Sequence, residues 1–113
     1  MKIRREPQAV LLGSLEEQVM LAVIRRRDDA YGMNVRRELE IVTERDVTIG
    51  SVYATLDRLE AKGLVSSVRT ALADASSRRV FAVTGAGARS LALTRSMRER
   101  LWTGVKLQPL LNT

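Results

Sequence analysis

The sequence contains no cysteine and no histidine. Without cysteine there are no disulfides and no thiolate chemistry, which agrees with a reducing environment. Without histidine the chain lacks the commonest general base and the commonest metal ligand. Catalysis would then need a carboxylate pair or an activated serine or lysine, and the acidic residues are scattered over predicted helix surfaces without converging. We therefore expect neither an enzyme nor a cofactor nor a metal site.

Long apolar stretches are absent as well. The run from Val19 to Ile24 is much shorter than the roughly 18 residues that a membrane span needs. The basic segment from Met1 to Gln8 is not followed by a secretory hydrophobic region with a cleavage site. These features predict a cytoplasmic protein without a membrane partner. The 113 residues are enough for one domain with a thin core, so a long helix outside that core will need a partner surface.

Arginine is what the sequence has in excess. Lysine and arginine together number 19 against 13 acidic residues, and the only lysines are Lys2, Lys62 and Lys106. A planar guanidinium can bind a phosphate at two points, so this bias favours a nucleic-acid partner. The alternative is a basic surface that serves only solvation.

Hydrophobic periodicity and capping residues predict four helices. The predicted helices cover residues 14–27, 31–43, 49–62 and 85–107. Ser14 and Glu17 have capping-box spacing at the start of the first helix, and Thr48 is a candidate N-cap of the third. Gly63 suits a left-handed C-cap after the third helix, and Pro109 should end the last one.

A change of period after Gly63 predicts two strands. β-Branched residues are frequent in 64–72 and 80–83, so we expect a hairpin whose tip, 73–77, is mobile. The fold class is therefore mainly α with a small β-hairpin, a winged helix-turn-helix followed by a long C-terminal helix. The expected parts are an N-terminal arm (1–12), which becomes ordered only on docking or dimerisation, a winged helix-turn-helix DNA-binding domain (13–83), and a C-terminal dimerisation helix with its tail (84–113).

The apolar residues of the first three helices indicate a core. The helix at 14–27 is apolar nearly all round, so it should lie centrally. The other two helices each have one apolar stripe. These stripes consist of Val35, Leu39 and Val42 in the second helix, and Ile49, Val52, Leu56 and Leu59 in the third.

The other side of helix 49–62 is the main functional candidate. It carries small and polar residues, namely Gly50, Ser51, Ala54, Thr55 and Arg58, with Tyr53 at its flank. Small residues let a helix enter the DNA major groove, where hydroxyls and arginine can contact phosphates or base edges. The alternative is structural, with Tyr53 packed between helices and Ser51 acting as a cap.

Three arginines mark the hairpin. Arg69 lies on its first strand, and Arg78 and Arg79 follow its tip. Basic residues on a wing would bind the DNA backbone beside the recognition helix or enter a minor groove. The alternative is a charged edge that prevents pairing with other strands.

The last helix has an apolar row with a four-residue spacing. The row consists of Leu93, Met97, Leu101 and Val105, with Trp102 beside it. The rest of the domain is too small to cover this row, which predicts a homodimer interface, although packing within one subunit is the alternative. A planar small-molecule effector could stack on Trp102 between subunits, but tryptophan on such a stripe is usually core.

Four stretches resemble the PadR family of bacterial transcriptional regulators. They are LGSLEEQVMLAVI (12–24), DAYGMNVRRELE (29–40), TIGSVYATLDRLEAKGLV (48–65) and RRVFAVTGAG (78–87). The third stretch is the most specific, and the resemblance extends from Leu12 to about Arg100. The chain departs from the family pattern at Ala54, where proline is frequent, and at Val80 and Phe81, where consecutive aromatic residues are usual.

The resemblance implies a dimeric winged-helix protein, usually a repressor, that binds a palindromic operator. Helix 48–62 would enter the major groove, 64–83 would form the wing, and helix 85–107 would form the dimer. Carried over by position, the groove and phosphate contacts are Thr48, Ser51, Tyr53, Thr55 and Arg58, and the wing contacts are Arg78 and Arg79. The alternative is a winged-helix module that binds protein or RNA, which would show a weak salt effect and no preference for a palindrome.

Overall fold

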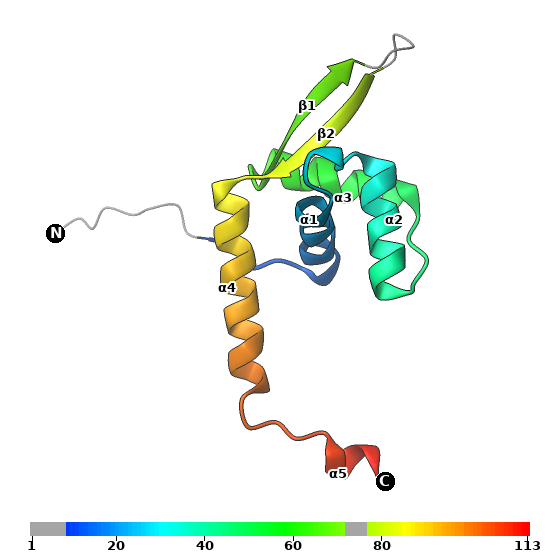
Figure 1. The fold of residues 1–113 in the computed structure, drawn as a ribbon. Helices are drawn as coiled ribbons and strands as arrows, with labels where there is room; N and C mark the ends of the chain where they lie inside the picture. Colours follow the sequence, from blue (N-terminus) through cyan, green and yellow to red (C-terminus); the bar gives the residue numbers. More distant parts are fainter. Residues whose placement is uncertain (1–8, 72–76) are drawn as a thin grey trace, which may run out of the picture.

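The computed structural model describes residues 9–71 and 77–113. Its elements are α1 (Ser14–Arg26), η1 (Arg27–Asp29), α2 (Gly32–Thr43), α3 (Ile49–Ala61), β1 (Val65–Ala71), β2 (Ser77–Val83), α4 (Gly85–Trp102) and α5 (Gln108–Leu111). Figure 1 shows α1, α2 and α3 gathered beneath the hairpin, while α4 leaves the base of the hairpin and extends away. The predicted fold class is confirmed. Residues 1–8 of the predicted arm lie outside the described residues, as do residue 72 of the predicted first strand and residues 73–76 of the predicted tip.

The core lies between the three helices and the base of the hairpin. α1 packs against α2, α3 and β2. The largest apolar side chains in this core are Val19, Met20, Val23, Val35, Leu39, Val52, Leu56, Leu59, Leu64, Val65 and Phe81. Burying a side chain of this size stabilises a fold by about 1.5–3 kcal/mol. The predicted stripe of α3 is confirmed, with Ile49 half-buried at its edge.

The outer side of α1 and α2 is less covered than the sequence predicts. Val42 is 52% exposed, so its predicted burial is wrong. It lies on the last turn of α2 and shares a shallow, apolar depression with Leu21 of α1. Leu21 and Ile24 are themselves exposed, so α1 is not buried all round. The contacts of α1 with α2, α3 and β2 bury Val19, Met20 and Val23 and leave Leu21 and Ile24 exposed.

The helix ends follow the capping chemistry in the sequence, with one shift. Thr48 accepts a hydrogen bond from the Ser51 N–H at 3.1 Å and caps α3 as predicted. At α1 the capping pair is displaced by one residue, since Gly13 donates its N–H to the Glu16 carboxylate at 3.1 Å. Gly63 has a φ of +75°, which confirms the predicted left-handed residue after α3.

The segment before α2 lies alongside the hairpin. Tyr31 forms an isolated antiparallel bridge with Val80 of β2. The Phe81 N–H also donates to the Ala30 carbonyl at 2.8 Å, and the Phe81 side chain is buried in the core. These contacts attach β2 to the helical unit, which fixes the hairpin relative to the start of α2.

α4 is shorter than predicted. It ends at Trp102, and Gly104 with a φ of +79° follows the last turn. Gly104 tolerates this conformation, so the chain turns there before it reaches Pro109. Pro109 instead lies in the first turn of α5, where a missing N–H costs nothing.

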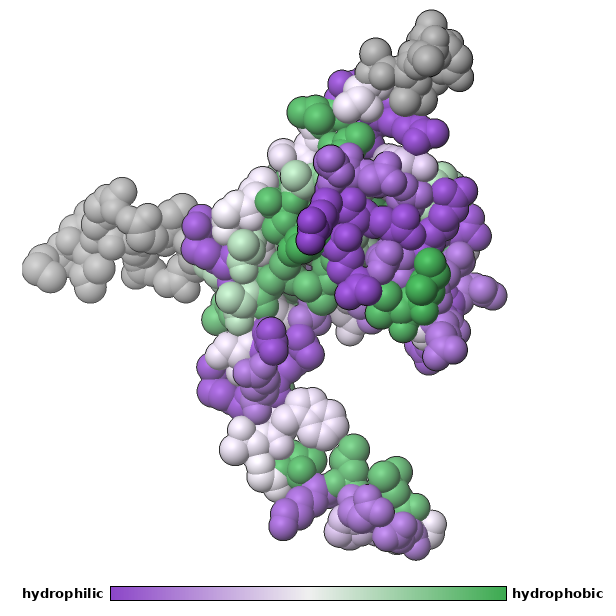
Figure 2. Space-filling view, in the orientation of Figure 1, coloured by the Kyte–Doolittle hydropathy of each residue, from purple (hydrophilic) through white to green (hydrophobic). Residues whose placement is uncertain are grey.

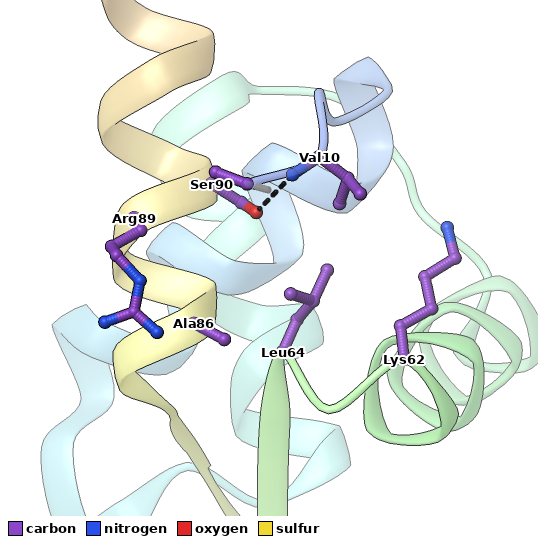
Figure 3. Close-up of a pocket in the computed structure, with 7 residues that line it drawn as sticks. Val10, Lys62, Leu64, Ala86, Arg89 and Ser90 are labelled. Carbon is purple, nitrogen blue, oxygen red and sulfur yellow. Dashed lines mark hydrogen bonds between the residues drawn. The ribbon is translucent and has the colours of Figure 1, made fainter. Parts of the chain in front are cut away.

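Part of the predicted arm already lies along α4. Val10 donates its N–H to the Ser90 hydroxyl at 3.2 Å, as Figure 3 shows, and Leu12 donates to Thr94 at 3.1 Å. Both hydroxyl-bearing side chains are buried on α4. The expectation that the arm becomes ordered only on docking or dimerisation is therefore wrong for residues 9–12, because α4 of the same chain holds them.

Candidate nucleic-acid interface

The solvent side of α3 carries a compact set of polar groups. Thr48, Ser51 and Arg58 are exposed, and Tyr53 is 38% exposed. The Thr48 hydroxyl donates to the Ser51 hydroxyl at 2.8 Å, which joins the two groups at the start of the helix. Gly50 and Ala54 between them are also exposed and have almost no side chain. A helix with this surface can approach the floor of a major groove without steric conflict.

Thr55 does not belong to this surface, and its predicted outward orientation is wrong. Its side chain is 1% exposed, and it lies three residues after Val52 and four before Leu59 on the buried stripe. Its hydroxyl accepts a long hydrogen bond from Arg58 Nη2 at 3.4 Å. Threonine has nearly the shape of valine, so the core accommodates it once the hydroxyl has a partner.

Arg58 extends from α3 towards the start of α1. Its Nε lies 3.8 Å from the Glu16 carboxylate, which also accepts a 2.9 Å hydrogen bond from Lys62. The hydrogen bond from Lys62 holds the pKa of Glu16 below its ordinary value of 4.5, although partial burial works in the other direction. The Arg58 side chain remains half-exposed, and an ion pair of this kind is weak, so a phosphate can compete for it.

Arg79 connects the wing to α3. Its guanidinium donates to Asp57 at 3.1 Å and to Glu60, and it lies 4.8 Å from the centre of the Phe81 ring. Burial disfavours the charged form, but the hydrogen bonds to Asp57 and Glu60 raise the pKa of Arg79. The Ser67 hydroxyl and then Arg79 lower the pKa of Glu60. Arg79 therefore forms ion pairs with two carboxylates of its own chain.

Arg78 has a different environment. Its guanidinium lies over the Tyr31 ring, 4.1 Å from the ring centre, which is a cation–π arrangement. Among the described residues no carboxylate forms an ion pair with it. A cleft of about 270 Å³, here called the wing cleft, opens beside this pair. It is lined by Tyr31, Tyr53, Arg69, Arg78 and Arg79.

Gly32 provides the space that Tyr53 occupies. A Cβ atom added to Gly32 would lie 2.3 Å from Tyr53 Cζ and 2.5 Å from its hydroxyl oxygen. The Tyr53 ring on α3 therefore packs directly on the backbone at the start of α2. Sequence reasoning missed Tyr31 as a site residue. Tyr31 lies in the stretch 29–40 that contributes to the family resemblance, but only the tertiary fold brings it to the wing.

Comparisons with known proteins identify the family of the chain. The family model described as "Transcriptional regulator PadR-like family" matches residues 20–93. The chain belongs to the PadR-like family of transcriptional regulators. This assignment supports a DNA-binding transcriptional regulator and not an enzyme. A search of curated proteins gives no match.

Solved structures of PadR-like proteins share the fold. A PadR-like transcription factor from Bacteroides fragilis matches with a TM-score of 0.67 and 24% identity, over 77% of this chain and 82% of that one. A PadR-like regulator from Bacillus cereus gives a TM-score of 0.69 at 20% identity, with coverages of 88% and 92%. A PadR family regulator from Eggerthella lenta gives 0.65 at 25% identity, with 88% of each chain covered.

In this PadR-like chain the apolar row of α4 lacks cover within the subunit. Leu101 is 69% and Trp102 56% exposed, and Leu93 and Val105 are exposed as well, with Met97 partly buried. Val105 lies beyond the end of α4. Figure 2 shows hydrophobic patches on the segment that follows α4, interspersed with hydrophilic ones. The alternative that the whole row packs inside one subunit does not hold for the single chain.

A second pocket lies between the arm, α3 and α4. It has a volume of about 400 Å³ and is lined by Ala9, Val10, Lys62, Leu64, Ala86, Arg89 and Ser90. Figure 3 shows Lys62 and Arg89 on opposite sides of it, so the two cations do not converge. Within 9–71 and 77–113 there is no cluster of acidic side chains that could hold a metal ion. No helix in these ranges is long and apolar enough to span a bilayer.

Proposed function

We propose that this PadR-like protein is a cytoplasmic repressor that binds a palindromic operator as a homodimer. The observation that carries the proposal is the exposed side of α3, where Ser51, Tyr53 and Arg58 face solvent beside the basic wing cleft. In this assignment 13–83 is the DNA-binding unit and 84–113 the dimerisation unit. α3 enters the major groove, and the wing follows the adjacent backbone.

The uncovered row of α4 supports the proposed dimer. A single helix that leaves Leu93, Leu101 and Trp102 exposed gains most by pairing with the same helix of a second copy. Two copies would place two α3 helices on one side of the DNA, with half-sites about one turn, or roughly 34 Å, apart. The flat Trp102 ring would then lie at the interface, where a planar effector could stack on it.

Selection from a random DNA library with the purified protein tests the function. The expected result is an enriched palindrome with half-sites about 10 base pairs apart, or a multiple of this spacing, and affinity that falls steeply with salt. Enrichment of a single half-site would contradict the dimeric arrangement. An absence of enrichment together with a weak salt effect would contradict DNA recognition and favour a protein or RNA partner.

A further inference from the structure

We infer that the wing cleft binds one phosphate of the DNA backbone, with Arg78, Tyr31 and Tyr53 as its ligands. The inference rests on the proposed function and adds to it the part of the duplex that this cleft recognises. It also introduces Tyr31, which precedes α2, as a DNA contact outside the recognition helix and the wing. The cleft volume of about 270 Å³ leaves room for a phosphate with part of its sugar and bound water.

The composition of the cleft suits a phosphate diester. Its lining comprises two tyrosines and three arginines, and the two tyrosines are the only ones in the chain. Tyrosine hydroxyls and guanidinium groups donate hydrogen bonds, and a phosphate diester offers two charged acceptor oxygens. Both tyrosine rings are fixed by packing. Tyr53 lies against Gly32, and Tyr31 lies under the Arg78 guanidinium and pairs with β2.

Arg78 and Arg79 of the wing cleft differ in their partners. Arg79 lines the cleft but donates to Asp57 and Glu60, so it serves mainly to hold the wing against α3. Arg78, which pairs with no carboxylate among the described residues, is the group that a phosphate can engage without displacing an ion pair.

Fluorine NMR of the full chain labelled with 3-fluorotyrosine tests the inference, because both resonances arise from the cleft. The probe is a mixed-sequence duplex of about 20 base pairs at low salt, where binding is dominated by phosphate contacts. We expect both resonances to shift as the duplex binds. Resonances that stay in place while anisotropy reports a bound duplex would overturn the phosphate site and leave DNA binding intact. A duplex that does not bind at all would contradict the proposed function itself.

Variants identify the ligands. Arg78→Gln should weaken duplex binding about tenfold and lower the salt slope by about one, independently of sequence. Tyr31→Phe keeps the ring under Arg78 but removes the hydroxyl, and it should weaken binding by about threefold to tenfold. Arg89→Gln removes the same charge from α4, outside the cleft, and should change neither value. Equal effects of Arg78→Gln and Arg89→Gln in folded proteins would overturn the assignment.

Discussion

The packing of Tyr53 on Gly32 makes a quantitative prediction for Gly32→Ala. The added Cβ would lie 2.3 Å from Tyr53 Cζ, whereas ordinary contacts begin near 3.4 Å, so the ring must move by at least about 1 Å. Overpacking of this kind costs about 1–3 kcal/mol, and alanine recovers up to about 1 kcal/mol of it through helix propensity. We expect a net loss of about 0–3 kcal/mol in the free energy of unfolding.

The effect on DNA binding should exceed what this change in stability would suggest. A displaced Tyr53 hydroxyl would lose the DNA contact proposed for it, so a folded Gly32→Ala protein should bind its operator about tenfold more weakly. The assays are urea unfolding for stability and fluorescence anisotropy for operator affinity.

A double-mutant cycle with Tyr53→Ala decides whether the ring is the cause. Without the ring, Gly32→Ala should cost no stability and should leave the remaining DNA affinity unchanged. If Gly32→Ala has the same cost in stability and affinity with and without the Tyr53 ring, the packing argument is refuted.

Three further predictions concern the dimer, the base of α4 and pH. Leu101→Asp should yield monomers in analytical ultracentrifugation, and a persistent dimer would move the interface elsewhere. Gly87→Ala places a Cβ 2.1 Å from the Leu64 carbonyl oxygen and should destabilise the fold by about 1–3 kcal/mol or more in thermal melts. Gly50→Ala is the control, because its Cβ meets nothing within 4 Å, and it should be neutral or stabilising in the same melts. Because the folded-state pKa of Glu16 is lowered, its stabilisation is present above about pH 4.5 and is lost as the pH falls through the folded value. Glu16→Gln should therefore lower the urea midpoint near pH 7 and lower it progressively less as the pH falls below 4.5, and a loss that does not change with pH would contradict the ion pair.

Much of the fold could be predicted because its signals are local. The periodicity of α3, its cap at Thr48 and its end at Gly63 depend on residues close in sequence, and all three agree with the structure. The predicted outward orientation of Thr55 is wrong because its polar side chain suits the exposed side of α3, whereas its position belongs to the buried stripe. Val52, Thr55, Leu56 and Leu59 have the spacing of one buried stripe, and that spacing was the available signal.

The parts that sequence reasoning missed depend on contacts between distant segments. Arg79 meets Asp57 and Glu60 only because the hairpin folds back over α3. Tyr31 reaches the cleft through its pairing with Val80, far along the chain. Neither contact leaves a periodic or capping pattern in the sequence. The charge of Arg79 therefore predicts a wing contact with DNA, whereas in the fold this side chain forms ion pairs within the chain.

The most direct test of the account is the operator affinity of the double variant Tyr53→Ala/Arg58→Ala. Arg95→Ala, which removes an arginine from the exposed side of α4, is the matched control. The account predicts that the double variant loses about 1–3 kcal/mol or more of binding free energy, with circular dichroism showing an intact fold and the control unchanged. Wild-type affinity in a folded double variant would mean that DNA is not bound through the exposed side of α3.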